Sequence, residues 1–206
     1  MLGTRQIRNQ EPSPYATGGD FCRIFKEDMD RLYRLAFLLT ADHEKAEQCF
    51  VSGLDDVVKG NPVFKEWARS WARRAVILNA VRVINPRPAD GNNHYQLSSD
   101  PVDKINRALP AAKEAEIAAI LALGAFERFV YVITVLERYS DQECSVLVGC
   151  TRRDVVAART QAFQQIGSTM ETHAQQRAAS AGNAASRERR GSGLQLLISP
   201  PLATTA

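Results

Sequence analysis

The stretch SDQECSVLVGCTRRD, residues 140–154, carries two helix-start signals in quick succession. Ser140 is followed at the third position by Glu143, and Thr151 is followed at the same spacing by Asp154. This spacing is typical of a capping box, in which side chains and backbone N–H groups at a helix start bond to each other reciprocally. One short helix is therefore expected to end within this stretch, and a second helix to begin directly after it.

The turn between these two helices contains Gly149, and the second helix opens with Arg152 and Arg153. A tight turn often needs a positive φ, which glycine adopts without strain. Two helices joined by such a turn form a helix-turn-helix pattern, whose second helix enters the major groove in many DNA-binding proteins. A generic helical hairpin would carry the same caps, so both interpretations stay open at this point.

The second helix is expected to have a buried stripe and a DNA-facing surface. The buried stripe consists of Val155, Ala158, Ala162 and Ile166, which are spaced at three or four residues. The amides at a helix N-terminus attract phosphate, and an arginine can donate two hydrogen bonds to one guanine. The acidic side chain of Asp154 reduces the local positive charge. The candidate DNA contacts are Thr151, Arg152, Arg153, Val156, Arg159 and Gln161.

The composition sets wide limits on function. The chain has 206 residues, 45% of them hydrophobic, which is enough for one core of ordinary size or two small ones. Its net charge of +3 is too small to indicate a nucleic-acid partner by itself. No apolar run is long enough to cross a membrane, and the polar N-terminus has no secretory signal region. A bacterial cytoplasmic protein without membrane contact is expected.

The four cysteines, Cys22, Cys49, Cys144 and Cys150, stand singly in apolar helical patterns, which predicts reduced core residues. They form no pair with the spacing of metal ligands, and the three histidines are scattered. No nucleophile, base or glycine-rich phosphate loop occurs in a recognisable spacing. We therefore expect neither an enzyme nor a catalytic, cofactor or metal site, and no small-molecule substrate.

Three polar segments divide the chain. Residues 1–20 and 171–206 contain few large apolar side chains, which predicts a disordered head and a disordered tail. Residues 85–104 include several prolines and predict a flexible linker. The ordered parts are expected to be two small helical domains, at residues 21–84 and 105–170.

Both domains are predicted to be all-α, because period-two alternation is weak throughout the chain. In the first domain, apolar residues repeat at helical spacing over residues 21–39, 46–57 and 64–84, which predicts three helices. In the second domain, an alanine-rich segment precedes the run FVYVITVL, residues 129–136. That run could form a buried strand or a buried helix, and its charged flanks and helical context favour the helix.

With these motifs assembled, the chain resembles the two-domain, extracytoplasmic-function sigma factors of the sigma-70 family. Residues 123–151 are similar to region four, the helix-turn-helix domain that binds the minus-thirty-five promoter element. Gly124 stands where the family usually has proline. The residues in step with the family pattern are Leu123, Glu127, Arg128, Leu136, Ser140, Glu143, Leu147, Gly149 and Thr151.

Residues 32–84 resemble region two, and their last helix resembles the one that melts and binds the minus-ten element. The resemblance implies DNA contacts at Arg69, Arg73, Arg74 and Arg82. Trp67 and Trp71 could stack on unpaired bases. Alternatively, they form a core stripe with Ala75 and Leu78, and their spacing favours the core.

The chain departs from the family at the positions that would dock on the polymerase clamp. Gln48, Val51 and Ser52 stand where the family has an acidic residue followed by Gln-Glu. A second departure lies on the promoter-reading helix, where Arg74 and Leu78 replace the usual Asn and Asp. The remaining candidates for polymerase binding are Asp42, Glu44, Glu47 and Gln48. An acidic first helical turn is also ordinary capping, so these charges have two interpretations.

The resemblance implies a transcription initiation factor that binds core RNA polymerase and promoter DNA, with an anti-sigma factor as a further partner. Two alternatives remain. One is a degenerate sigma-like regulatory protein that binds a partner without melting promoter DNA. The other is a stand-alone helix-turn-helix regulator, which would need a dimerisation helix to match a palindromic site.

Overall fold

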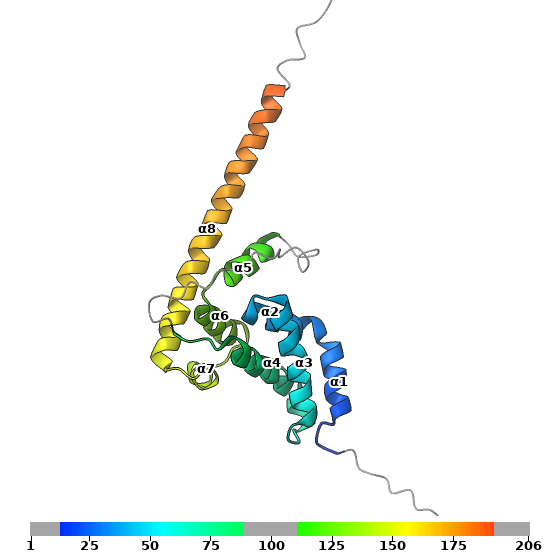
Figure 1. The fold of residues 1–206 in the computed structure, drawn as a ribbon. Helices are drawn as coiled ribbons and strands as arrows, with labels where there is room; N and C mark the ends of the chain where they lie inside the picture. Colours follow the sequence, from blue (N-terminus) through cyan, green and yellow to red (C-terminus); the bar gives the residue numbers. More distant parts are fainter. Residues whose placement is uncertain (1–12, 89–110, 192–206) are drawn as a thin grey trace, which may run out of the picture.

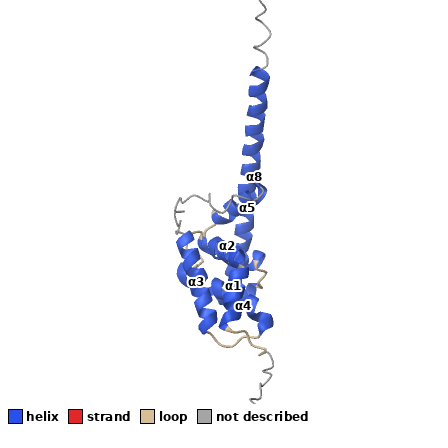
Figure 2. Cartoon of the chain, turned by 90° about the vertical axis from the view of Figure 1, so that its right-hand side faces the viewer, coloured by secondary structure: helices blue, strands red, loops and turns tan. Residues whose placement is uncertain are grey.

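The computed structural model describes residues 13–88 and 111–191, and these parts are helical with no named strand. The predicted all-α fold class is therefore confirmed (Figures 1 and 2). The helices are α1 (Gly18–Glu27), α2 (Met29–Thr40), α3 (His43–Lys59), the short 3-10 helix η1 (Lys65–Trp67), α4 (Ala68–Ile84), α5 (Ala111–Leu121), α6 (Ala125–Tyr131), the π-helical turn η3 (Val132–Leu136), α7 (Asp141–Val148) and α8 (Arg152–Gly191).

The expected single helix over residues 21–39 is two helices, α1 and α2, which meet at Asp28. Neither glycine nor proline marks the break, but the Asp28 carboxylate accepts a hydrogen bond from Arg69 of α4. A tertiary ion pair thus stabilises a break that local sequence does not indicate. The expected head over residues 1–20 is also shorter, because a capping box between Thr17 and Asp20 starts α1 at Gly18. Residues 1–12 lie outside the described part.

Helices α1 to α4 pack around a core of large side chains. Phe25, Leu32, Leu39 and Ile77 are among the most fully buried. At Gly53 of α3, an added Cβ would lie 3.2 Å from the Val76 side chain, so this glycine permits close packing of α3 on α4. Most of the buried face of α4 is alanine, which also favours a short distance between helix backbones.

Helices α5 to α8 form the second half of the core. The run at residues 129–136 is helical as predicted, ending in the π-helical turn η3. The predicted stripe of α8 is confirmed, since Val155, Ala158, Ala162 and Ile166 are all buried. The T-shaped contact of Tyr131 with Phe163 adds to the packing of α6 on α8.

The two halves pack directly against each other. Helix α2 contacts α5, α6 and η3, helix α4 contacts α7, and the buried residues form one continuous hydrophobic core. The predicted linker over residues 85–104 is described only to Pro88. It begins at Asn85, which ends α4 in the left-handed region, and residues 85–88 have no regular secondary structure. Residues 89–104 lie outside the described part of the chain.

Helix α8 continues to Gly191, and its distal half projects away from the other helices (Figures 1 and 2). The expectation of disorder from residue 171 is therefore wrong for residues 171–191. The segment is rich in alanine, glutamine and arginine, which have high intrinsic helix propensity, so a helix can form without an apolar face. Residues 192–206 are not among those described. Within the described ranges, no helix is long and apolar enough to span a membrane.

Candidate nucleic-acid interface

Both predicted capping boxes are present at the starts of α7 and α8. The backbone N–H of Glu143 donates to Ser140 Oγ at 3.2 Å, and the N–H of Ser140 donates back to Glu143 Oε2 at 2.8 Å. At the second box, the N–H of Asp154 donates to Thr151 Oγ1 at 3.2 Å, and the N–H of Thr151 donates to Asp154 Oδ2 at 3.0 Å. The boxes fix where each helix starts, and therefore where the connecting turn lies.

Gly149 lies in the left-handed region of the backbone map, with φ of 77° and ψ of 40°. Its N–H and that of Cys150 both donate to the carbonyl of Ser145, at 2.9 and 3.0 Å. These bonds satisfy a carbonyl at the end of α7 that has no partner within the helix. The positive φ predicted for this position is confirmed, and α7, Gly149 and α8 form the tight helix–turn–helix unit expected from the sequence.

The box carboxylates are held in their charged form. Hydrogen bonds from the Ser140 hydroxyl and N–H lower the pKa of Glu143 below its usual value. Bonds from the Thr151 hydroxyl and N–H likewise lower the pKa of Asp154. A carboxylate at a helix N-terminus is also favoured by the helix dipole. At the start of α8 it offsets part of the positive charge that Arg152 and Arg153 present.

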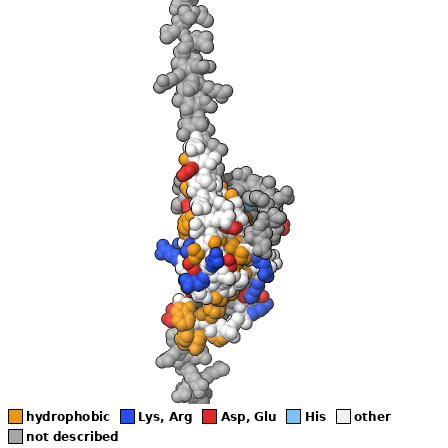
Figure 3. Space-filling view, turned by 90° about the vertical axis from the view of Figure 1, so that its left-hand side faces the viewer, with side chains coloured by type: hydrophobic (Ala, Val, Ile, Leu, Met, Phe, Trp, Pro, Cys, Tyr) orange, Lys and Arg blue, Asp and Glu red, His pale blue; other side chains and the backbone are white. Residues whose placement is uncertain are grey.

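Arg152 and Arg153 project from the first turn of α8 and are exposed. No ion pair or hydrogen bond joins either guanidinium to another side chain within residues 13–88 and 111–191. Val156 and Gln161 are exposed as well, and so is Thr151. On the face of the molecule seen in Figure 3, Lys and Arg side chains gather over the body below the projecting part of α8, mixed with acidic and apolar ones.

Arg159 differs from the other candidates on α8. Its guanidinium makes two hydrogen bonds to the carboxylate of Asp141 on α7, the longer of them at 3.3 Å. This two-point ion pair orients α7 relative to α8, so Arg159 is a structural residue of the helix-turn-helix unit in this state. The sequence did not distinguish it from Arg152 and Arg153, because its acidic partner lies on another helix.

The prediction that Trp67 and Trp71 belong to the core is wrong, since 58% and 44% of their surface is exposed. Helix α4 begins only at Ala68, and it buries a face that includes Ala68, Ala72 and Ala75. Trp67 lies in the preceding 3-10 turn, where its ring contacts Phe64 edge-on at 5.3 Å between centroids. Phe64 in turn stacks on Tyr15 at 4.8 Å. An exposed aromatic surface therefore lies at the start of α4.

The arginines of α4 are mostly paired within the protein. Arg69 binds the carboxylates of Glu27 and Asp28, and Arg82 contacts Asp56 at 2.8 Å. Arg73 lies 3.8 Å from Glu137, which belongs to the other half of the chain. Arg74 is half-buried beside Tyr139. Burial raises the pKa of Tyr139, and the positive charge of Arg74 opposes that rise only in part. These four residues form no continuous, unpaired basic surface.

The candidate polymerase-binding residues lie at the start of α3. Asp42 is the N-cap, accepting a hydrogen bond from the Lys45 N–H at 3.0 Å, and this bond is the main reason why its pKa is lowered. Glu44, Glu47 and Gln48 are exposed on the first two turns. The capping interpretation of Asp42 is confirmed, and polymerase docking at these positions stays a prediction.

Two charged residues between the halves were not predicted from the sequence. Arg128 is buried and donates to the carbonyls of Leu39, Leu121 and Leu123, at 3.3, 3.5 and 3.0 Å. Leu39 and Leu121 lie at the C-terminal ends of α2 and α5, where carbonyls lack partners within the helix. Burial lowers the pKa of Arg128 to about 10. The second of these charged residues is Glu137, which is half-buried beside Arg73, and burial raises the pKa of its carboxyl.

Among the described residues, no cluster of three or more histidine, cysteine or acidic side chains could hold a metal ion. All four cysteines are free, but the prediction that they are core residues is wrong for Cys22, which is exposed, and only partly right for Cys150. Cys49 and Cys144 are buried, and burial raises the pKa of Cys49 to about 11 and that of Cys144 to about 12. These two thiols therefore stay protonated near neutral pH, which makes them poor nucleophiles.

Comparison of the sequence with models of known protein families gives no match, and comparison with curated proteins gives no significant match.

Proposed function

We propose that this chain is a sigma-like transcription initiation factor, in which α7 and α8 form a DNA-binding helix-turn-helix unit. The observation that carries the proposal is the first turn of α8. Its start is set by a capping box after a left-handed glycine, and it presents Arg152 and Arg153 without partners among the described residues. An exposed helix N-terminus bearing arginines is suited to phosphate and to guanine edges in the major groove.

In this proposal the chain has two functional units. Residues 21–84 form a region-two-like unit that binds core RNA polymerase through the start of α3 and the minus-ten element through α4. Residues 105–170 form the region-four-like unit, with residues 85–104 as the linker. Exposed Trp67 and Trp71 support a DNA-contacting role for the start of α4, because aromatic rings can stack on unpaired bases.

One set of observations favours the alternative of a degenerate, sigma-like regulatory protein in the cytoplasm. Arg69, Arg73 and Arg82 already have acidic partners, and α4 packs against the second half of the chain. For α4 to bind DNA, these pairs must be exchanged for phosphates, and the two halves must separate at Arg73 and Glu137. Formation of an open promoter complex with core polymerase would exclude this alternative.

The DNA-binding part of the proposal is tested by selection of DNA sequences from a random pool, followed by affinity measurements on the enriched site. The double variant Arg152→Ala/Arg153→Ala should weaken binding by about 1 to 3 kcal/mol per lost base contact. Loss of phosphate contacts alone would lower affinity equally for all sequences and reduce the salt dependence.

The matched control is Lys59→Ala, which removes an exposed positive charge from the end of α3. It should leave affinity for the selected site unchanged. Absence of any enriched sequence, with and without core polymerase, would contradict the proposal. Equal affinity of the double variant and the unchanged protein would also contradict it.

A further inference from the structure

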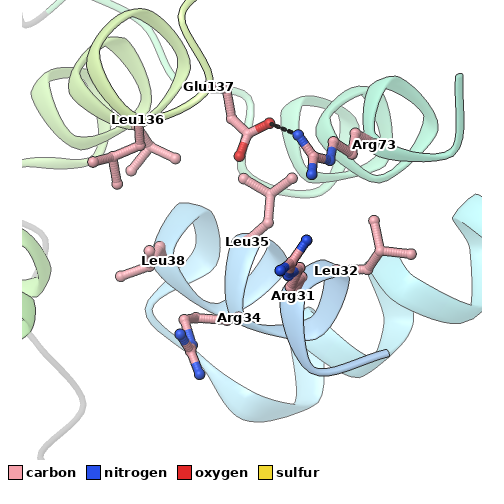
Figure 4. A pocket seen from close by; sticks show the side chains of 9 residues that line it. Arg31, Leu32, Arg34, Leu35, Leu38, Arg73, Leu136 and Glu137 are labelled. Atoms are coloured by element: carbon pink, nitrogen blue, oxygen red, sulfur yellow. Dashed lines mark ion pairs between the residues drawn. The ribbon is translucent and has the colours of Figure 1, made fainter. Parts of the chain in front are cut away.

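A pocket of about 310 Å³ opens between α2, α4 and the end of η3, at the junction of the two halves (Figure 4). This volume is at the lower end of the range of small-molecule sites in proteins, about 300 to 1,000 Å³. Side chains from both halves line the pocket, so it exists only in the packed arrangement. The pocket is separate from the proposed DNA-binding turn of α8, because no residue of α8 lines it.

The floor of the pocket is apolar. Leu35 points from α2 toward the Arg73–Glu137 pair, and Leu38 and Leu136 lie beside it (Figure 4). Leu136 is 39% exposed, although it is a large apolar side chain next to the core. Covering this surface with an apolar group would remove it from water, which is favourable at roughly 25 cal/mol per Å².

The rim of the pocket is strongly basic. Arg31 and Arg34 come from α2 and Arg73 comes from α4. Arg31 and Arg34 share a face of α2 with Leu35 and Leu38, because positions three, four and seven apart align on a helix. Within the described ranges, neither Arg31 nor Arg34 makes an ion pair or a side-chain hydrogen bond.

The lining includes one carboxylate, that of Glu137, which lies beside Arg73, and three arginines, of which Arg31 and Arg34 come from α2 (Figure 4). Its 3.8 Å separation from Arg73 leaves the pair loose. The rim therefore carries a net positive charge even when Glu137 is ionised. A ligand that suits such a site is an anion. Arginine side chains only donate hydrogen bonds, and their planar fork matches the geometry of a carboxylate or a phosphate.

We propose that this pocket binds a small organic anion that carries its carboxylate or phosphate on a short apolar chain. The anionic group binds to the guanidinium groups of Arg31 and Arg34, and the chain packs mainly on the exposed side chain of Leu136, next to Leu35 and Leu38, which are already buried. Since both halves contribute to the site, the bound ligand stabilises their packed arrangement by linkage. This inference is independent of the proposed function, because it needs neither DNA nor polymerase.

The test is calorimetric titration of the full chain with octanoate and with octyl phosphate, which share the chain and differ in the anionic group. At least one of them should bind saturably, about tenfold or more tighter than either 1-octanol or inorganic phosphate, because head and chain contribute together. Saturable binding of neither amphiphile would overturn the proposal. Equal affinity for 1-octanol would overturn it too, since the arginines would then contribute nothing.

Variants locate the site. Arg31→Ala/Arg34→Ala should lower affinity about tenfold or more, because charge-assisted hydrogen bonds are lost. Glu137→Gln should raise affinity for the anion, because it removes the one negative charge from the pocket lining. The control Arg152→Ala/Arg153→Ala changes the net charge equally at a distant turn and should bind as the unchanged protein does. Unaltered affinity in Arg31→Ala/Arg34→Ala, with its circular dichroism spectrum retained, would contradict the assignment.

Discussion

At the scale of single residues, Gly149 is the position where backbone conformation decides whether the α7–α8 turn can form. Its φ is 77°, and a Cβ added there would meet nothing within 4 Å. The effect of Gly149→Ala is therefore conformational rather than steric. The substitution should lower the free energy of unfolding by about 1 to 2 kcal/mol, because alanine adopts the left-handed region less readily than glycine. Urea denaturation followed by circular dichroism measures this change.

Gly167 provides the matched control. It lies within α8, and a Cβ added there also meets nothing within 4 Å. Gly167→Ala should raise stability by up to about 1 kcal/mol, because alanine is the better helix former. Equal effects of the two substitutions would show that the turn does not depend on a left-handed residue.

Residue roles were only partly predictable from the sequence. The caps and the Gly149 turn were predicted, because each depends on residues within four positions of one another. The partners of Arg69, Arg128 and Arg159 were not, because each partner lies on a different helix. The tryptophans were misplaced for a related reason. Spacing identifies a stripe on one side of a helix, but α4 also has a stripe of alanines, and the sequence does not show which of the two stripes faces the core.

At the scale of elements, the capping boxes of α7 and α8 make the stability of the fold depend on pH. The pKa values of Glu143 and Asp154 are lowered in the folded state from their usual 4.5 and 3.8. A depressed folded pKa means that the unfolded chain binds protons first, so the stabilisation is present above the usual pKa and is lost as pH falls through the folded pKa. The double variant Glu143→Gln/Asp154→Asn should therefore lose less stability than the unchanged protein between about pH 5 and pH 3.

Thermal unfolding followed across that pH range checks this prediction. Asp30→Asn, which removes an exposed carboxylate outside both boxes, is the control and should keep the slope of the unchanged protein. An acid dependence that is identical in the double variant would mean that these carboxylates contribute nothing to the helix starts.

Some element boundaries were predicted from local signals, but the start of α1 was missed although the Thr17–Asp20 capping box is also a local signal. Asp42 starts α3 and Ser140 starts α7 as expected. The break between α1 and α2 and the continuation of α8 to Gly191 were not predicted. The first depends on the tertiary pair of Asp28 with Arg69, and the second on intrinsic propensity outweighing the lack of an apolar face.

At the scale of the whole molecule, the shared core predicts that both halves unfold together. Arg128 contributes to this coupling, because it supplies donors to carbonyls at the ends of α2 and α5. Calorimetry should show a single transition with equal calorimetric and van't Hoff enthalpies. Arg128→Met should lower stability by about 2 kcal/mol, since it leaves buried carbonyls unpaired. Two separate transitions in the unchanged protein would contradict a common core.

The packing of the halves could not be predicted from the sequence, because no local pattern identifies the contacts of α2 with α6 or of Arg73 with Glu137. The sequence predicted two helical units and the structure joins them in one core. Under the proposed function, this packed arrangement is the state of the protein free of promoter DNA, because α4 could contact DNA only once the halves separate at Arg73 and Glu137.

The central claim, a sigma-like initiation factor, is tested most directly by transcription in vitro from fragmented genomic DNA, using core RNA polymerase with and without the protein. We predict that the protein co-elutes with core polymerase and adds a set of start sites that share an upstream motif. Arg152→Ala/Arg153→Ala should abolish most of those starts. Start sites identical to those of core polymerase alone, together with no co-elution, would contradict the account.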